Sequence, residues 1–247
     1  MEKSLIKNIK YSAGRSHGKI SVRHKGGRVK RNYRMVDFVC NRFDIPAVIK
    51  SIEYDPYRSS NIALICYIDG RKSYILAPNE IKIGDKIMSS NKKISFDIGN
   101  RMPLEVIPSG TAVHNIQIKP EKNGTIVRSA GTSAEVLSGD NPKWVQVKLP
   151  SGEVRLFNKK ALATIGKVSN ADHFLRTIGK AGIKRKMGVR PTVRGVAMSP
   201  YAHPHGGGEG RTGTGGIPQT PWGKLAHGGR TRKKKKYSNM MIIKRRK

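Results

Sequence analysis

The chain has 247 residues, with 49 Lys or Arg against 16 Asp or Glu, and its formal net charge at pH 7 is +33. Such an excess of positive charge repels itself in a free monomer and predicts a resident polyanionic partner. No stretch approaches the roughly 18 apolar residues of a membrane span, and the N-terminus lacks an apolar signal-peptide core. We therefore expect no membrane partner, no secretion and two reduced thiols at Cys40 and Cys66.

The basic charge is concentrated at the two ends. Residues 1–35 hold 11 basic side chains and one acidic, residues 36–179 hold 20 and 14, and residues 180–247 hold 18 and one, Glu209. A nearly balanced centre between two basic ends predicts a globular body with two arms that enter nucleic acid. The expected divisions are a basic N-terminal arm at 1–35, an OB-fold domain at 36–107, an SH3-like barrel at 108–182 and a Gly-, Arg- and Lys-rich C-terminal arm at 183–247.

The first body is expected to be all-β. Apolar runs at 47–54 and 62–68 predict two strands, and the second run is apolar on both faces, as in a buried strand. Asp69-Gly70 is a hairpin signal, and residues 73–76 return as a third strand. Short strands with frequent turns favour a small barrel of the OB type.

The second body repeats this style. Strands are predicted at 111–118, 143–149 and 153–157, with Val145, Val147 and Leu149 on one face of the middle one. Residues 170–176 predict a short helical turn that Asn170 could cap, and regular patterning ends after Gly182. The expected fold class is all-β, an OB-fold barrel followed by an SH3-like barrel, with extended basic N- and C-terminal arms.

The C-terminal segment contains the least ordinary sequence, YAHPHGGGEGR at 201–211. A segment so polar and Gly-rich buries little apolar surface, so we expect it to order only against a polyanion such as folded RNA. The string at 208–213 matches G-x-G-x-x-G but lacks the flanking strand and helix of a dinucleotide site. His203 and His205 are too few ligands for a structural zinc site, and no nucleophile motif accompanies them, so we expect neither metal site nor catalytic residue.

RNA contacts are expected from basic, aromatic and imidazole side chains, because Arg matches phosphate with its planar fork and aromatic rings stack on bases. The expected RNA-binding residues are Arg15, His24, Lys25, Arg28, Lys30, Arg31, Arg34, Tyr57, Arg58, Arg128, Arg176, Lys180, Lys184, Arg185, Lys186, Arg190, Arg194, His203, His205, Arg211, Trp222, Lys224, Arg230, Arg232 and Lys233.

Residues 188–211, GVRPTVRGVAMSPYAHPHGGGEGR, closely resemble the signature of the universal second protein of the large ribosomal subunit, the L-two family. Further matching segments are 33–38, 45–48, 53–64, 74–78, 113–116, 128–132, 175–182 and 220–224. The resemblance implies an OB barrel and an SH3-like barrel, both termini threaded into large-subunit rRNA, and a non-enzymatic role in subunit joining and in supporting the peptidyl-transferase centre.

The same resemblance implies that His203, Gly206, Gly207 and Gly208 lie near that centre. It implies as partners large-subunit rRNA, other ribosomal proteins and the small subunit at the interface, with no small-molecule substrate and no cofactor beyond rRNA-associated Mg²⁺. The family's bacterial pattern has an acidic residue before this histidine; here it is Ala202, which weakens any acid-assisted role for His203.

The bacterial-type loop and the richness in Lys, Asn and Ile favour an organellar ribosome, mitochondrial rather than plastid, with a bacterial cytoplasm as the alternative. A competing interpretation is a free-standing RNA-binding regulator built on the same barrels. The Gly/Pro/Arg tail argues against it, because a protein that must dissociate gains little from a long segment ordered only inside RNA.

Overall fold

The structure is a computed structural model that describes residues 2–138, 141–229 and 231–246. The chain forms two compact units. The first, called the body below, contains residues up to Lys10, Arg31–Thr177 and the segment from Tyr237 onward, and the second contains Tyr11–Lys30 and Ile178–Lys236. Within the described residues, no helix is both long and apolar enough to cross a membrane.

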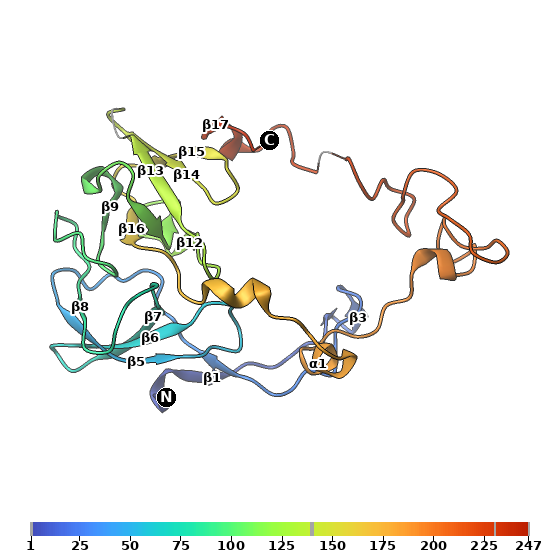
Figure 1. Cartoon of the computed structure of the whole chain (residues 1–247), viewed down its shortest axis with the longest axis horizontal. Coiled ribbons are helices and arrows are strands. Elements are labelled where there is room, and N and C mark those ends of the chain that lie inside the picture. Colours follow the sequence, from blue (N-terminus) through green and yellow to red (C-terminus); the bar gives the residue numbers. More distant parts are fainter. Residues whose placement is uncertain (1, 139–140, 230, 247) are drawn as a thin grey trace. The chain divides into compact units, whose positions relative to one another are not determined.

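Strands make up most of the regular structure (Figure 1). Those of the N-terminal half are β1 (Ile6–Asn8), β2 (Arg15–Ser16), β3 (Lys19–Ile20), β4 (Asn32–Arg34), β5 (Ala47–Glu53), β6 (Ile62–Tyr67), β7 (Lys72–Leu76), β8 (Lys86–Ile87) and β9 (Arg101–Pro103). Those that follow are β10 (Ala112–His114), β11 (Ile116–Gln117), β12 (Gly124–Ile126), β13 (Ala134–Ser138), β14 (Trp144–Lys148), β15 (Val154–Asn158), β16 (Leu162–Ile165) and β17 (Ile242–Lys244). The α-helix is α1 (Ala181–Lys186), and 3-10 turns occupy Lys3–Leu5, Leu104–Val106, Ala171–Leu175, Gly195–Ala197 and Tyr237–Asn239.

The first barrel is built on a four-stranded antiparallel sheet in the order β7-β6-β5-β8. Both faces of β6 are buried. Ala63, Ile65 and Tyr67 face the main core, whereas Ile62 and Leu64 pack with Tyr74 beneath the N-terminal segment. The predicted strands at 47–54, 62–68 and 73–76 and the hairpin at Asp69-Gly70 are confirmed, with Gly70 at a φ of 81° that glycine adopts without strain.

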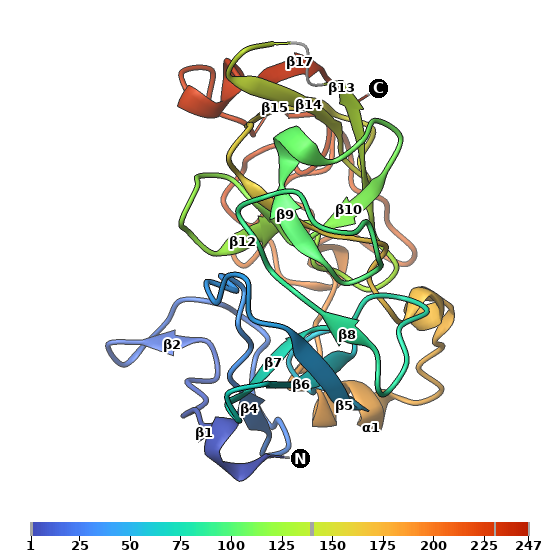
Figure 2. The same cartoon turned by 90° about the vertical axis from the view of Figure 1, so that its left-hand side faces the viewer.

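The second barrel is a seven-stranded antiparallel sheet in the order β17-β15-β14-β13-β10-β16-β9 (Figure 2). Val145 and Val147 lie in its core and Leu149 packs against it, as their alternation predicted. The pairing of β9 with β16 places Arg101–Pro103 in this second sheet, before the boundary expected at residue 107. The predicted fold class, an OB-type barrel followed by an SH3-like barrel, is confirmed.

The predicted strand at 111–118 is interrupted. Asn115 adopts a left-handed φ of 49°, which ends β10 at His114 and starts the separate strand β11 at Ile116. Asparagine tolerates this conformation better than most residues. The Asn115 carbonyl turned out of the ladder accepts a hydrogen bond from Arg101 Nη1 at 2.9 Å.

Two local expectations at 170–182 are corrected. Asn170 stands before the 3-10 turn Ala171–Leu175, but its side chain does not cap the turn; its amide donates to the Ser59 carbonyl at 2.6 Å. Regular structure also does not end at Gly182, because α1 continues from Ala181 to Lys186. The last turn of α1 carries Lys184, Arg185 and Lys186, and cations there interact favourably with the helix dipole.

The basic arms are anchored rather than free at several places. In the body, β1 pairs with β4, and β17 pairs with β15 through Val154 opposite Lys244. Sequence reasoning did not anticipate β17, because two isoleucines followed by a Lys/Arg cluster are too short a run to indicate a strand. In the second unit, Gly26 N–H donates to the Gly188 carbonyl at 3.0 Å and Arg190 N–H to the His24 carbonyl at 3.0 Å. Parts of the two arms thus hold each other.

Candidate nucleic-acid interface

The body carries a groove of about 690 Å³ whose lining combines aromatic rings with two guanidinium groups. We call it the aromatic–basic groove, and its residues are Tyr33, Phe38, Tyr57, Arg58, Ser59, Leu76, Thr125, Val127, Arg128, Ser129, Thr132 and Pro150.

Phe38 is the central ring of this groove. The Arg128 guanidinium lies 4.4 Å from the ring centroid and the Arg58 guanidinium 5.5 Å from it. Tyr33 and Tyr57 meet edge to face, with centroids 5.2 Å apart. Cation–π contacts of this kind keep the planar guanidinium groups against apolar surface while leaving N–H donors for other acceptors.

A turn at Asp55 sets the position of Tyr57 and Arg58. The buried Asp55 carboxylate accepts the Tyr57 backbone N–H at 2.9 Å, and its other oxygen lies 2.8 Å from Arg58 Nη1. The ion pair neutralises part of the Arg58 charge and holds the side chain beside Phe38. Arg58 therefore acts here as a positioned planar donor.

The groove exists because loops from both barrels meet. Ser59 Oγ accepts the Ala130 backbone N–H at 3.1 Å, and the Ser59 carbonyl accepts the Asn170 amide. Arg128 is in turn fixed by donating from Nη1 to the Gly124 carbonyl at 3.2 Å. Since an unstacked base presents a flat π-face and its phosphate presents acceptors, this set of rings and guanidiniums can hold both parts of a nucleotide.

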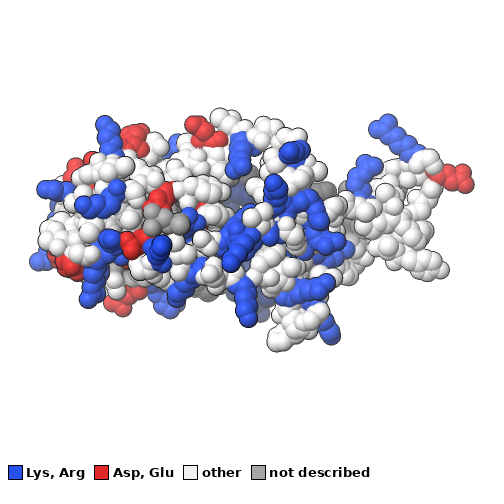
Figure 3. Space-filling model, turned by 90° about the horizontal axis from the view of Figure 1, so that it is seen from below, with Lys and Arg blue, Asp and Glu red and all other residues white. Residues whose placement is uncertain are grey.

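The second unit presents a further set of basic and aromatic side chains. The Arg28 guanidinium lies 4.2 Å from the Tyr11 ring centroid, and that of Arg23 lies 5.1 Å from the ring of Trp222, which is 73% exposed. On the face of the molecule drawn in Figure 3, Lys and Arg side chains spread widely, whereas Asp and Glu form scattered spots. Such a surface supplies phosphate contacts without sequence preference.

The two imidazoles of the loop around His203 make hydrogen bonds within that loop, and their contact with RNA stays a prediction. His203 is only 8% exposed, and its Nδ1 accepts the His205 backbone N–H at 3.0 Å. His205 Nε2 accepts the Gln219 backbone N–H at 2.8 Å, and the two rings lie 4.6 Å apart. The imidazoles therefore hold their own loop together, since each supplies a hydrogen-bond acceptor to the backbone.

Glycines permit this close packing. A Cβ at Gly195 would lie 2.6 Å from the His203 ring, and one at Gly206 would lie 2.5 Å from the Met198 carbonyl oxygen. Gly207 and Gly208 adopt φ values of 85° and 93°, in the region that favours glycine. Gly206 thus allows close approach of two backbone segments inside the loop, and Gly207 and Gly208 allow its left-handed turns.

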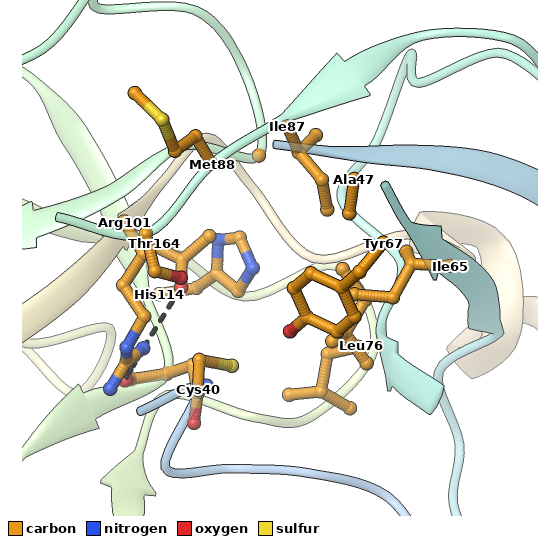
Figure 4. A pocket seen from close by; sticks show the side chains of 14 residues that line it. Cys40, Ala47, Ile65, Tyr67, Leu76, Ile87, Met88, Arg101, His114 and Thr164 are labelled. Carbon is orange, nitrogen blue, oxygen red and sulfur yellow. Dashed lines mark hydrogen bonds between the residues drawn. The ribbon is translucent and has the colours of Figure 1, made fainter. Parts of the chain in front are cut away.

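A buried polar cluster, drawn in Figure 4, joins the two barrels of the body beside a cavity of about 20 Å³. Arg101 Nη1 donates to Thr164 Oγ1 at 3.0 Å and to the Asn115 carbonyl. Burial lowers the pKa of Arg101, raises the pKa of the Cys40 thiol to about 11 and raises that of Tyr67. Both cysteines are free thiols, as predicted.

Burial also lowers the pKa of His114 from 6.5 to about 4, and nearby Arg101 adds to the shift. His114 Nδ1 lies 2.8 Å from the Gly166 carbonyl, which can only accept, so Nδ1 carries the proton of a neutral ring. Between pH 6.5 and about 4 the unfolded chain binds a proton that the folded chain does not. We therefore expect the free energy of unfolding to fall by about 3 kcal/mol as pH drops through this window.

Urea denaturation of the full chain at several pH values checks this expectation. His114→Gln should flatten the dependence in that window, whereas His173→Gln, which changes an exposed histidine, should leave it unchanged. An equal pH dependence in the chain and in His114→Gln would contradict the assignment.

The structure brings together some of the predicted RNA-binding residues and separates others. Tyr57, Arg58 and Arg128 share the aromatic–basic groove, and Arg31 is tied to the same turn by donating to the Pro56 carbonyl. Those in the second unit are Arg15, His24, Lys25, Arg28, Lys30, Lys180, Lys184, Arg185, Lys186, Arg190, Arg194, His203, His205, Arg211, Trp222, Lys224, Arg232 and Lys233. Arg34 and Arg176 lie elsewhere in the body, and Arg230 lies outside the described residues.

Phe38 and Tyr33 are groove residues that sequence reasoning did not select. The only available signal was their place in the segment 33–38 that carries the family resemblance. Among the described residues, no group of three or more His, Cys, Asp or Glu side chains is arranged to hold a metal ion.

Two family models match the chain. The RNA-binding N-terminal domain of ribosomal proteins L2 matches residues 2–89, and the C-terminal domain of ribosomal proteins L2 matches residues 97–223. The N-terminal match includes Phe38 and the Asp55 turn, and the C-terminal match includes Arg128 and the His203 loop. The chain therefore belongs to the L2 family of ribosomal proteins, and it is a structural, RNA-binding protein of the large ribosomal subunit.

Proposed function

We propose that the chain holds large-subunit rRNA at two separate places: an unstacked nucleotide in the aromatic–basic groove, and phosphates along the basic second unit. The observation that carries this proposal is the Phe38 ring with Arg58 and Arg128 beside it. The resident polyanion explains why the chain carries a net charge of +33.

We further propose that the His203 loop supports the peptidyl-transferase centre and that the protein assists association with the small subunit. The closely packed Gly206–Gly208 backbone and its imidazole acceptors support a loop of defined shape at that place. Its contribution is structural, because His203 is buried and its Nδ1 already accepts a hydrogen bond. Apart from rRNA-associated Mg²⁺, no cofactor is needed for this role.

The ribosome in question is proposed to be organellar, mitochondrial rather than plastid. The support is compositional: the chain is rich in Lys, Asn and Ile, and its loop is of the bacterial type. Fractionation of the source cells, followed by detection of the chain in mitochondrial, plastid and cytosolic ribosomes, tests the location. Detection only in plastid or cytosolic particles would contradict it.

Sucrose-gradient sedimentation distinguishes a ribosomal constituent from a free-standing regulator. We expect steady cosedimentation with large subunits at low salt and loss of the protein only at high salt. If about eight basic residues neutralise phosphates, the slope of log affinity against log salt is about −6 to −7. A large free pool at physiological salt, or a slope near zero, would contradict the proposal.

A further inference from the structure

A second groove of the body has the opposite chemistry from the aromatic–basic groove. It has a volume of about 530 Å³, and its apolar lining includes Val39, Phe43 and Leu162. Two carboxylates, Glu105 and Glu121, also line it, with Lys160 as its only basic side chain. We call it the acidic groove.

The charges of the acidic groove disfavour nucleic acid. Glu105 and Glu121 are exposed, so their carboxylates would face any occupant, and phosphates brought beside them would be repelled. In a chain with 49 basic residues and 16 acidic ones, two glutamates around one apolar groove set this surface apart. The complementary occupant carries positive charge and apolar side chains.

An unsatisfied amide in the groove points to a peptide. Gln117 is fully buried and lines the groove, and its Oε1 accepts the Leu162 backbone N–H at 3.0 Å. Its Nε2 has no hydrogen-bond partner within the described part of the chain. A buried donor without an acceptor is costly, which favours a turn of the Gln117 side chain toward the groove, where a backbone carbonyl of an extended peptide would supply the acceptor.

We propose that the acidic groove binds a basic, extended segment of another ribosomal protein, packed on Val39, Phe43 and Leu162 and held by Glu105 and Glu121. This inference rests on the proposed function, because it takes the neighbours of the chain to be ribosomal. It adds that one groove of the body contacts protein, whereas the aromatic–basic groove contacts rRNA.

Photo-crosslinking inside assembled large subunits tests the assignment. A benzophenone amino acid at Asn41, an exposed residue that lines the acidic groove, should crosslink to a Lys- or Arg-rich peptide of another ribosomal protein, identified by mass spectrometry. The same probe at Thr125, which is exposed and lines the aromatic–basic groove, should crosslink to rRNA.

Charge reversal supplies the specificity test. Glu105→Lys with Glu121→Lys should reduce the Asn41 crosslink on the order of tenfold or more, because like charges across an interface are strongly unfavourable. The Thr125 crosslink and sedimentation with large subunits should be unchanged. Reversal of Asp172, an exposed carboxylate in the 3-10 turn Ala171–Leu175 that does not line the groove, is the matched control and should leave the Asn41 crosslink intact.

The outcomes separate the two proposals. An Asn41 crosslink to rRNA, to residues 180–247 of this chain or to nothing, with the Thr125–rRNA crosslink present, would overturn the protein-binding groove alone. Failure of the Thr125 crosslink together with failure to sediment with large subunits would overturn the proposed function. An Asn41–protein crosslink that survives the double charge reversal would also overturn the role of the two glutamates.

Discussion

Replacing Arg128 by glutamine is expected to weaken binding of the full chain to a transcript of its own large-subunit rRNA by about tenfold, or about 1.4 kcal/mol. Arg128 is exposed, lies over the Phe38 ring and lines the groove, and no carboxylate among the described residues pairs with it. The substitution removes the planar cation that we expect to contact the nucleotide. Filter binding at several salt concentrations measures the affinity and its salt dependence together.

Comparison of Arg128→Lys with Arg128→Gln distinguishes the planar shape of the side chain from its charge. Arg128→Lys keeps the charge but loses the planar fork, so its salt slope should match that of the unaltered chain while its affinity falls. Arg128→Gln should reduce the slope by about 0.7 to 0.9. Arg71→Gln changes an exposed arginine on the first-barrel hairpin, outside the groove, and should have little effect on affinity. Equal losses for Arg71→Gln and Arg128→Gln would contradict a specific role for the groove.

Arg128 is a better residue than Arg58 to substitute in this binding test, because Arg58 is ion-paired with the buried Asp55. Removing the Arg58 guanidinium would leave the fully buried Asp55 carboxylate without its ion-pair partner. Breaking a buried pair in this way costs about 3–5 kcal/mol and would confuse lost binding with lost stability. A thermal melt of each variant checks that the Arg128 substitutions leave the body folded.

Replacing His203 by alanine is expected to loosen the loop from Gly195 to Gln219 and to impair the large subunit without altering the barrels. The change removes the acceptor of the His205 N–H and empties the space against Gly195. Loss of a buried acceptor costs about 1–3 kcal/mol. Amide exchange at His205 and Gln219 should therefore accelerate by about tenfold or more, and peptide-bond formation and subunit joining by ribosomes carrying the variant should slow.

Companion variants separate loop shape from RNA contact. His203→Gln keeps an acceptor but loses the ring, so we expect partial rescue of both exchange and activity. Gly195→Ala should disturb the same packing, because the added Cβ would lie 2.6 Å from the His203 imidazole. Tyr201→Ala removes a fully exposed side chain of the same loop and should leave exchange unchanged. Normal amide exchange with impaired activity in His203→Ala would indicate that His203 acts by direct contact with RNA. Normal behaviour in every assay would contradict a function for the loop.

Local patterns were enough to predict the β bodies. Alternating residues such as Val145, Val147 and Leu149, and the doubly apolar run in β6, reveal strands because side chains alternate across a sheet regardless of what the strand pairs with. The hairpin at Asp69-Gly70 was visible for a similar reason, since its glycine meets the turn's need for a positive φ. The uneven charge was sufficient to predict a polyanionic partner.

Long-range contacts decided the sites. Tyr57 and Arg128 were each selected as single RNA contacts, but contacts across the two barrels, such as the Ser59–Ala130 and Ser59–Asn170 hydrogen bonds, make them one groove around Phe38. The carbonyl freed by the interruption at Asn115 likewise finds its donor at a distant residue, Arg101. No periodicity in the chain encodes which loop of one barrel meets which loop of the other.

The His203 loop shows the same limit most clearly. By itself, the sequence determined that residues 201–211 are polar, Gly-rich and unable to build an apolar core, and it led us to place the imidazole against RNA. The tertiary structure leaves that ring only 8% exposed, because Gly195 leaves room for it and its Nδ1 accepts the His205 backbone N–H. Burial of a side chain depends on the backbone that reaches it, and that approach is fixed only when the whole loop has folded.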